Sequence, residues 1–270
     1  MNTAIITLSG AGFILANHIA HALPNCTVYL HQAIQTDLPV KRFERVIALS
    51  EQIFTQYTNL IYIMPTGVVV RAIAAQVRHK LQDPAVVVVD VGGRWAISLL
   101  SGHEGGANQL AMQVANAIQV EPIVTTTTEA VRRLIIGIGC RKNMSAVKIL
   151  EAIHQGLALI QQTSEDVRML ATAEPKKSEV GLIEASQRLE LPLRVLSSQL
   201  IRQTFRSFEV SEFVQEKVNL PAVAEPSALL AGHHTRLLLP KQCFDGITIA
   251  IAEEMQDFLK PSHLENNSLG

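Results

Sequence analysis

The chain has 270 residues, of which 48% are hydrophobic and 17% are charged, and its formal net charge is −1 at pH 7. This composition is typical of a globular protein with one large domain or two small ones, and it excludes an intrinsically disordered chain. The near-zero net charge, without any block rich in lysine and arginine, argues against a nucleic-acid-binding surface.

Cysteine usage and hydropathy favour a cytoplasmic protein. The three cysteines, Cys26, Cys140 and Cys243, are far apart and odd in number, so they fit a reducing compartment and form no zinc-binding spacing. No apolar run reaches the length of a membrane span, and the N-terminal "MNTAIITLSG" lacks the basic start and cleavage site of a signal peptide. We therefore expect no membrane association.

Short β-rich runs alternate with helical patterns over the first 128 residues. Strands are predicted at residues 3–9, 27–30, 45–49, 60–64, 85–90 and 95–100. Gly92 and Gly93 supply a turn between the last two strands, which predicts a β-hairpin. Helices are predicted from residue 67 to about 76 and from 106 to 118; one side of the first carries Val70, Ile73, Ala74 and Val77. These elements predict an α/β domain with a mixed sheet.

A second, smaller α/β unit is predicted from "LIIGIGCRKNMSAVKILEAIHQGLALI" onward. This segment reads as a strand, a loop and a helix, with Ser145 as the N-cap and Ile149, Leu150, Ile153 and Leu157 as its buried stripe. Further strands are predicted at 192–197, 235–240 and 246–253, further helices around 179–189 and 211–217, and frayed residues at the end. We therefore divide the chain into two layered α/β domains, 1–130 and 131–260, and a flexible tail, 261–270.

Three junctions share one layout of strand, small-residue loop and helix start: "IYIMPTGVVVRAIA", "SLLSGHEGGANQLA" and "IIGIGCRKNMSAVK". The first turn of a helix leaves N–H groups unpaired, glycine lets a ligand approach the backbone, and α/β sheets bind ligands at the carboxyl ends of strands. We expect a ligand with several carboxylates or phosphates, held also by Arg71, Arg141 and Lys142. The alternative at each junction is that the glycines only form turns and caps.

Two residues at these junctions have a candidate chemical role. His103 lies near a helix start, where the field disfavours the charged imidazole, so it is a candidate general base; hydrogen bonding to its own loop is an equally good interpretation. Cys140 lies beside Arg141 and Lys142, a setting that lowers a thiol pKa, but we favour a small residue that closes a tight loop. The glycines of "SGAGFIL" lack the third glycine of a dinucleotide loop, which favours a simple tight turn.

The sequence resembles the CbiG family of cobalamin biosynthesis over nearly its whole length. "TGVVVRAIA", "DPAVVVVD", "ISLLSGHEGGANQLA" and "PIVTTTTEA" are similar to the N-terminal domain of the family. "GIGCRKNMSAVKIL", "SEFV", "VAEPSALLAG" and "LLLPKQ…GITIAIAE" are similar to its C-terminal domain. The "SGH-x-GGAN" signature is specific. Family members carry a middle segment that is missing here, because "TTTTEA" runs almost directly into "VRRLIIGIGC".

The resemblance implies a cobalt-precorrin-5A hydrolase, which opens the ring-A δ-lactone of a cobalt tetrapyrrole and releases the two-carbon unit at C20 as acetaldehyde. We expect His103 and Asp90 to share the proton transfers of this reaction. Substrate-binding residues are expected to be Thr66, Gly67, Arg71, Ser101, Gly102, Gly105, Gly106, Asn108, Arg141 and Lys142. Cobalt belongs to the substrate, so no protein-bound metal or other cofactor is expected.

A second hypothesis stays open because the middle segment is missing. The chain could be a non-catalytic carrier that hands tetrapyrrole intermediates to neighbouring enzymes of the pathway. The C-terminal domain resembles one that occurs alone in the aerobic pathway, where the lactone step is not used. This places the chemistry in the N-terminal domain and substrate holding in the C-terminal one.

Overall fold

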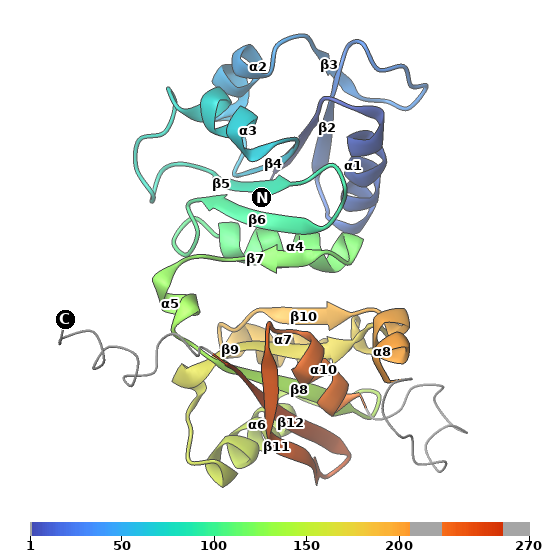
Figure 1. Ribbon diagram of the computed structural model, residues 1–270, viewed down its shortest axis with the longest axis vertical. Helices are drawn as coiled ribbons and strands as arrows, with labels where there is room; N and C mark the ends of the chain where they lie inside the picture. Colours follow the sequence, from blue (N-terminus) through green and yellow to red (C-terminus); the bar gives the residue numbers. More distant parts are fainter. Residues whose placement is uncertain (1, 206–222, 256–270) are drawn as a thin grey trace, which may run out of the picture. The chain divides into compact units, whose positions relative to one another are not determined.

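The computed structural model describes residues 2–205 and 223–255 of the chain. It divides into two compact units, residues 1–130 and the residues from 131 on. Each unit is a layered α/β structure with one mixed sheet, so the predicted fold class is confirmed (Figure 1). No helix in the described ranges is long and apolar enough to cross a membrane.

Unit 1 is built on a seven-stranded sheet with the order β3-β2-β1-β4-β5-β6-β7. The strands are β1 (Thr3–Thr7), β2 (Cys26–His31), β3 (Lys41–Phe43), β4 (Asn59–Ile63), β5 (Ala85–Val89), β6 (Trp95–Leu100) and β7 (Glu121–Ile123). The helices are α1 (Gly10–Ala22), α2 (Val46–Ile53), α3 (Thr66–Ile73), α4 (Ala107–Ile118) and the single turn α5 (Thr127–Ala130). The first five strands are parallel, β6 is antiparallel to β5, and β7 is parallel to β6.

Two helices cover each face of this sheet (Figure 1). Ile61 and Ile63 of β4 pack in the core that α1 and α4 cover. Leu60 and Tyr62 of the same strand pack in the core under α2 and α3. Because side chains alternate along a strand, a central strand covered on both faces is apolar throughout, which is why the apolar runs at 60–64 and 85–89 were recognisable in the sequence.

The direction of β6 decides where the loops of unit 1 lie. Leu100 at the end of β6 pairs with Val86 near the start of β5, whereas Ile63 at the end of β4 pairs with Val89 at the end of β5. The loop after β6 therefore lies at one end of the strands, together with the loop after β7. The loops after β1, β4 and β5 lie at the opposite end of the strands.

Two predictions in unit 1 are wrong. Residues 45–49 were predicted as a strand, but Val46–Ile53 forms α2, which buries Leu49 and Ile53 at helical spacing; a short apolar run does not distinguish the two. In α3 the buried residues are Val69, Ala72 and Ile73, whereas Val70 and Val77 of the predicted apolar side are 48% and 40% exposed.

Unit 2 contains a five-stranded sheet with the order β10-β9-β8-β12-β11. The strands are β8 (Leu134–Cys140), β9 (Val167–Ala173), β10 (Leu193–Leu196), β11 (Thr235–Phe244) and β12 (Ile247–Glu254). The helices are α6 (Ala146–Leu159), α7 (Val180–Arg188), α8 (Ser198–Phe205) and α10 (Ala224–Leu230), with short 3-10 turns at Ser164–Asp166 and Glu174–Lys176. Strands β8, β9 and β10 are parallel, and β12 and β11 continue the sheet in antiparallel fashion.

Most of the elements predicted for unit 2 are confirmed. Ser145 caps α6, with its hydroxyl accepting the N–H of Lys148, and Ile149, Ile153 and Leu157 are buried. The helix predicted around 179–189 and the three later strands are present as α7, β10, β11 and β12. The helix predicted at 211–217 and the frayed last ten residues lie outside the described residues. Strand β9 was not predicted.

The glycines of "IIGIGC" have a packing role inside β8 rather than a loop role. Gly137 and Gly139 lie within the strand, on the face that α10 covers. A Cβ at position 137 would collide with the backbone of α10 at Ala224 and Ala228. The helix thus packs directly on the strand backbone, which only glycine permits.

Candidate active site

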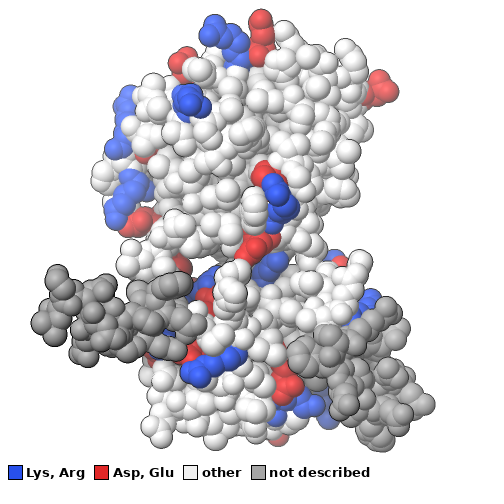
Figure 2. Space-filling view, in the orientation of Figure 1, with Lys and Arg blue, Asp and Glu red and all other residues white. Residues whose placement is uncertain are grey.

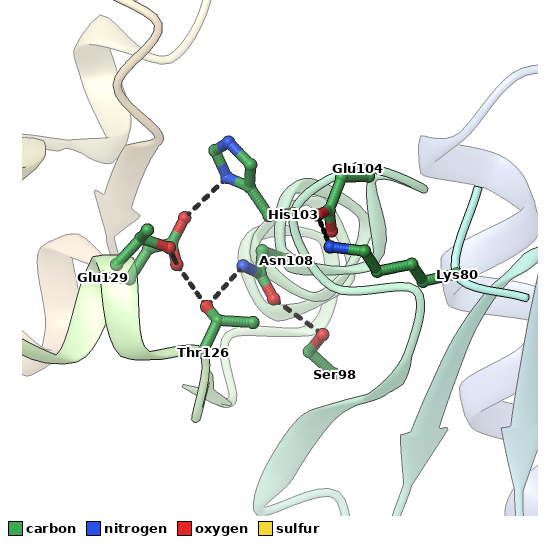
Figure 3. Close-up of polar contacts among 8 residues, drawn as sticks. Lys80, Ser98, His103, Glu104, Asn108, Thr126 and Glu129 are labelled. Atoms are coloured by element: carbon green, nitrogen blue, oxygen red, sulfur yellow. Dashed lines mark hydrogen bonds and ion pairs between the residues drawn. The ribbon is translucent and has the colours of Figure 1, made fainter.

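The candidate active site is a chain of polar side chains where β6 and β7 end (Figure 3). His103 comes from the loop between β6 and α4, and Glu129 from α5, which follows β7. The two meet with Nδ1 of His103 3.0 Å from Oε1 of Glu129. Thr126, the residue immediately before α5, and Asn108, the second residue of α4, connect the pair to the sheet.

This polar chain is continuous from the sheet to the histidine. The hydroxyl of Ser98 on β6 donates to Oδ1 of Asn108 over 2.8 Å, and Nδ2 of Asn108 donates to Oγ1 of Thr126 over 2.9 Å. Thr126 in turn donates to Oε2 of Glu129, whose other oxygen contacts His103. Each member is held by a different element, so the arrangement exists only in the folded domain.

Glu129 is ionised under ordinary conditions. Burial raises the pKa of this carboxyl, but hydrogen bonds from Thr126, Thr128 and His103 outweigh burial and lower the pKa to about 2. The hydroxyl of Thr128 contributes a 2.6 Å bond to the same oxygen that Thr126 contacts. A carboxylate that accepts several hydrogen bonds keeps its charge to low pH.

The glycines of "SGHEGG" let the loop fold tightly beneath His103. A Cβ on Gly102 would lie 2.6 Å from Cγ2 of Thr126 and 3.0 Å from Oδ1 of Asn108, so this glycine makes room for the polar chain. A Cβ on Gly105 would collide with Ser101, and Gly106 has φ = 85° at the N-cap position of α4. The loop consequently needs glycine at 102 and 105 for close approach and at 106 for backbone conformation.

Part of the expected anion-binding backbone is already used inside the loop. The N–H groups of Ala107 and Asn108, the first two residues of α4, donate to the carbonyls of Ser101 and Gly102 over 3.1 and 3.0 Å. Ser101 itself is 6% exposed, and its hydroxyl donates to the carbonyl of Asp83 over 3.1 Å. The side chain of Ser101 thus points into the protein and anchors the loop, and its role in substrate binding stays a prediction. Asn108 likewise supports Thr126 through its side-chain amide.

A second anchor holds the other side of the loop. Glu104 forms an ion pair with Lys80, which comes from the segment between α3 and β5. This bond lowers the pKa of Glu104. The loop is thus tied at Ser101, at Glu104 and at His103, while the imidazole of His103 remains 63% exposed. An exposed ring on a fixed loop can meet a substrate without rearrangement.

Thr66, Gly67 and Arg71 follow the opposite end of the strands from His103. They belong to α3, which follows the carboxyl end of β4. Arg71 lies in the last turn of this helix, and its guanidinium donates to the carbonyl of Gly67 over 3.0 Å. Because β6 runs antiparallel to β5, these residues do not lie beside His103, and their role in substrate binding stays a prediction.

Asp90 is also separated from His103. Asp90 follows β5, whereas Asp83, whose carbonyl accepts the hydroxyl of Ser101, precedes the same strand. The chain advances seven residues from Asp83 to Asp90, and at ~3.3 Å per residue the two positions are separated by roughly 20 Å. Asp90 accepts the N–H groups of Arg94 and Trp95 over 2.8 and 2.9 Å, and Nε of Arg94 over 3.1 Å. Burial raises its pKa, but these bonds lower it overall. Asp90 thus fastens the β5–β6 hairpin at the other end of β5 from the His103 loop, and we do not carry it into the proposed mechanism.

The cationic residues of unit 2 lie in the turn after β8. Arg141 and Lys142 are exposed, and the Arg141 N–H donates to the carbonyl of Gly246 over 3.0 Å. They are available to carboxylates of a ligand. Neighbouring Cys140 is half-buried, and burial raises its thiol pKa even though Lys176 acts in the opposite direction. This agrees with the interpretation of Cys140 as a packing residue rather than a nucleophile.

Sequence reasoning missed Glu129, Thr126, Thr128 and Ser98. The signal was "TTTTEA", because several hydroxyls and a carboxylate after a short strand are the usual contents of a site at the carboxyl end of that strand. Strand β7 was not predicted, so this signal was not visible. In the described parts of the chain, no group of three or more His, Cys, Asp or Glu side chains is arranged to hold a metal ion.

Charges are dispersed over the face of the molecule shown in Figure 2. Lysines and arginines alternate there with aspartates and glutamates instead of forming a broad basic surface. This agrees with the formal net charge of −1.

Comparisons with known proteins identify both units. Residues 48–129 match the family "Cobalamin synthesis G N-terminal", and residues 134–252 match "Cobalamin synthesis G C-terminus". The first match contains the whole polar chain from Ser98 to Glu129. The second contains Arg141 and Lys142.

Individual relatives match different shares of the chain. The cobalt-precorrin-5A hydrolase of Salmonella typhimurium is 39% identical over 47% of this chain, but the matched segment is only 36% of that protein, about a third of its length. The cobalt-precorrin-5A hydrolase of Priestia megaterium is 23% identical and matches 92% of this chain and 94% of its own length. That alignment runs over 352 residues, more than this chain contains, so the Priestia protein has residues without a counterpart here.

A solved structure extends the comparison. The cobalamin biosynthesis protein chiG from Agrobacterium tumefaciens is 30% identical over 45% of this chain and 98% of its own, with a TM-score of 0.37. Together, the two family matches cover most of the described residues in the order N-terminal domain, C-terminal domain. The chain therefore belongs to the CbiG (cobalamin synthesis G) family.

Proposed function

We propose that the chain is a cobalt-precorrin-5A hydrolase, the activity named for its Salmonella and Priestia relatives. The observation that carries the proposal is the exposed imidazole of His103, fixed by Glu129 on a loop tied to the sheet. A histidine held by a carboxylate is a common arrangement for moving protons in hydrolysis.

The proposed reaction has two parts. Water adds to the carbonyl of the ring-A δ-lactone, and the ester C–O bond breaks to give a carboxylic acid and a free alcohol at C20. The alcohol then loses its proton and becomes the C=O of acetaldehyde while the C–C bond to the macrocycle breaks. The electron pair of that bond enters the conjugated macrocycle, which takes up a proton, so that one water is consumed overall.

His103 is the residue that removes a proton from water in the first part and from the C20 alcohol in the second. The N–H groups around Gly105 and Gly106 stabilise the oxyanion that forms on the lactone. Cobalt enters with the substrate, and no residue of the chain is assigned to hold it.

The test is to incubate the purified protein with cobalt-precorrin-5A and to measure acetaldehyde and the ring-opened product. The wild type is expected to release acetaldehyde, and His103→Ala to lower the single-turnover rate by roughly 10²–10⁴-fold, the usual value of a positioned acid–base group. His18→Ala, at an exposed position on α1, is the matched control and should react like the wild type.

The carrier hypothesis predicts another result for the same assay. A carrier would bind the tetrapyrrole, which the change in its absorption spectrum reports, and would release no acetaldehyde. Binding without release by the wild type would therefore reject the hydrolase proposal. Release that His103→Ala leaves within a few-fold of the wild type would remove His103 from the mechanism.

A further inference from the structure

We propose that Glu129 is a positioning residue that fixes the proton of His103 on Nδ1 and leaves Nε2 as the basic atom. The inference rests on the proposed function and deepens it, because it names the atom that removes the protons. It is carried by the charge of Glu129, by the direction of the hydrogen bonds that reach it, and by the different exposure of the two side chains.

The charge of Glu129 decides which ring nitrogen carries the proton. Oε1 of Glu129 lies 3.0 Å from Nδ1 of His103, and an ionised carboxylate can only accept hydrogen bonds. Nδ1 must therefore be the donor. A neutral imidazole has one N–H, so its lone pair is then on Nε2.

The negative charge of Glu129 also sets the direction of each hydrogen bond that connects it to Ser98. Thr126 has one hydroxyl proton, which it donates to Oε2 of Glu129, so its oxygen can only accept from Asn108. This turns Nδ2 of Asn108 toward Thr126 and Oδ1 toward Ser98, whose hydroxyl then donates. Hydrogen bonds that all run in one direction polarise one another. Both oxygens of Glu129 are held, so the carboxylate cannot turn away from the ring.

Glu129 is itself a poor candidate for the base. With a pKa of about 2 it is protonated in only ~10⁻⁵ of molecules at neutral pH, so its affinity for a proton is too low to activate water. Its side chain is 17% exposed, whereas that of His103 is 63% exposed. Nε2 of His103 is thus the atom of the pair that a substrate reaches, and the carboxylate stabilises the imidazolium that forms when the ring takes up a proton.

The first test reads the tautomer directly and needs no substrate. Nitrogen-15 NMR of the histidine rings in the full chain, with the His103 signals assigned by their loss in His103→Ala, distinguishes Nδ1–H from Nε2–H. The wild type is expected to carry the proton on Nδ1, and Glu129→Gln to lose this preference because the amide N–H can donate to Nδ1. An Nε2–H tautomer in the wild type would overturn the inference.

The second test is kinetic. Glu129→Gln is expected to lower the rate of acetaldehyde release by roughly 10²–10⁴-fold, as expected for a histidine in the wrong tautomer. Glu129→Asp, which keeps the carboxylate, should recover part of the rate.

A matched control separates positioning from the loss of a nearby negative charge. Glu104 is a second carboxylate on the His103 loop, but it is paired with Lys80 and does not contact Nδ1. Glu104→Gln loosens one anchor of the loop but leaves the carboxylate on Nδ1, so it should lose less rate than Glu129→Gln and should keep the Nδ1–H tautomer. An equal loss of rate in Glu104→Gln and Glu129→Gln would refute a positioning role for Glu129.

Thr126→Val provides a second route if Glu129→Gln folds poorly. It removes only the hydroxyl that donates to Glu129, and we expect a smaller loss of rate, with Thr126→Ser restoring the wild-type value. Failure of the two proposals can be distinguished. A wild type that shows the Nδ1–H tautomer but releases no acetaldehyde rejects the hydrolase function and supports the fixed tautomer.

Discussion

Nδ1 of His103 and Oε1 of Glu129 lie 3.0 Å apart, although 26 positions separate the two residues in the sequence. The contact forms because β6 and β7 are parallel neighbours, so the loop after one strand meets the helix after the other. An exposed histidine is thereby joined to a carboxylate that stays ionised down to a pH of about 2. Loop residues on a rigid sheet are the usual place for such a pair.

The stability of the protein in acid should depend on Glu129. A carboxyl group whose pKa falls from its ordinary 4.5 to about 2 in the folded state stabilises the fold above pH 4.5, and this contribution is lost as the pH falls toward 2. Urea unfolding should therefore show Glu129→Gln to be less stable than the wild type at pH 7 and nearly equal to it near pH 2. A difference that stays constant over this range would contradict the low pKa.

Gly102→Ala should lower activity more than stability. The added Cβ would lie 2.6 Å from Cγ2 of Thr126 and 3.0 Å from Oδ1 of Asn108, so these two side chains must separate. We expect a loss of acetaldehyde release of at least tenfold with little change in the circular dichroism spectrum, because misplacement of a catalytic group by about 1 Å is costly. Gly10→Ala, where the added Cβ meets nothing within 4 Å, is the control.

Asp90→Asn should affect stability rather than chemistry. The carboxylate accepts the N–H groups of Arg94 and Trp95 and pairs with the Arg94 side chain, which fastens the hairpin. We expect a loss of about 1 kcal/mol in the free energy of unfolding, the usual contribution of such bonds at a partly exposed site. Loss of acetaldehyde release without loss of stability would return Asp90 to the list of catalytic groups.

The cysteines should react with a thiol reagent in the order of their exposure. Cys243 is exposed, whereas Cys26 and Cys140 are half-buried and burial raises the pKa of both thiols. At pH 7.5 a maleimide followed by mass spectrometry should modify Cys243 first, because the thiolate is the reactive species. Faster labelling of Cys140 would revive its candidacy as a nucleophile.

Limited proteolysis should cut between the two compact units and spare the glycine loop. Val131 is 64% exposed, whereas Arg133 is tied to Glu253 and to the carbonyl of Asp166. Proteinase K, which cuts with little sequence preference, is expected to cut first between residues 130 and 133, which leaves Glu129 on the N-terminal fragment. The three anchors at Ser101, Glu104 and His103 should protect the loop, so a first cut between 98 and 110 would show that the loop is not preorganised.

The sequence by itself determined the class of the fold and most of its elements. Continuous apolar runs such as 85–89 predict strands covered on both faces, and the capping residue Ser145 predicts the start of α6, because these signals depend on interactions between residues close in the sequence. The same local signals failed at 45–49, where an apolar run of five residues fits a strand and a helix equally well.

Only the tertiary structure decided which of the predicted site residues share a site. Gly92 and Gly93 already predicted a hairpin, which reverses β6, but the consequence for the loops needs the strand order β1-β4-β5-β6-β7. That order places Arg71 and Asp90 at one end of the strands and His103 at the other, and it brings Glu129 to His103. Strand order is set by packing of the whole sheet between two helical layers, and no stretch of sequence contains it.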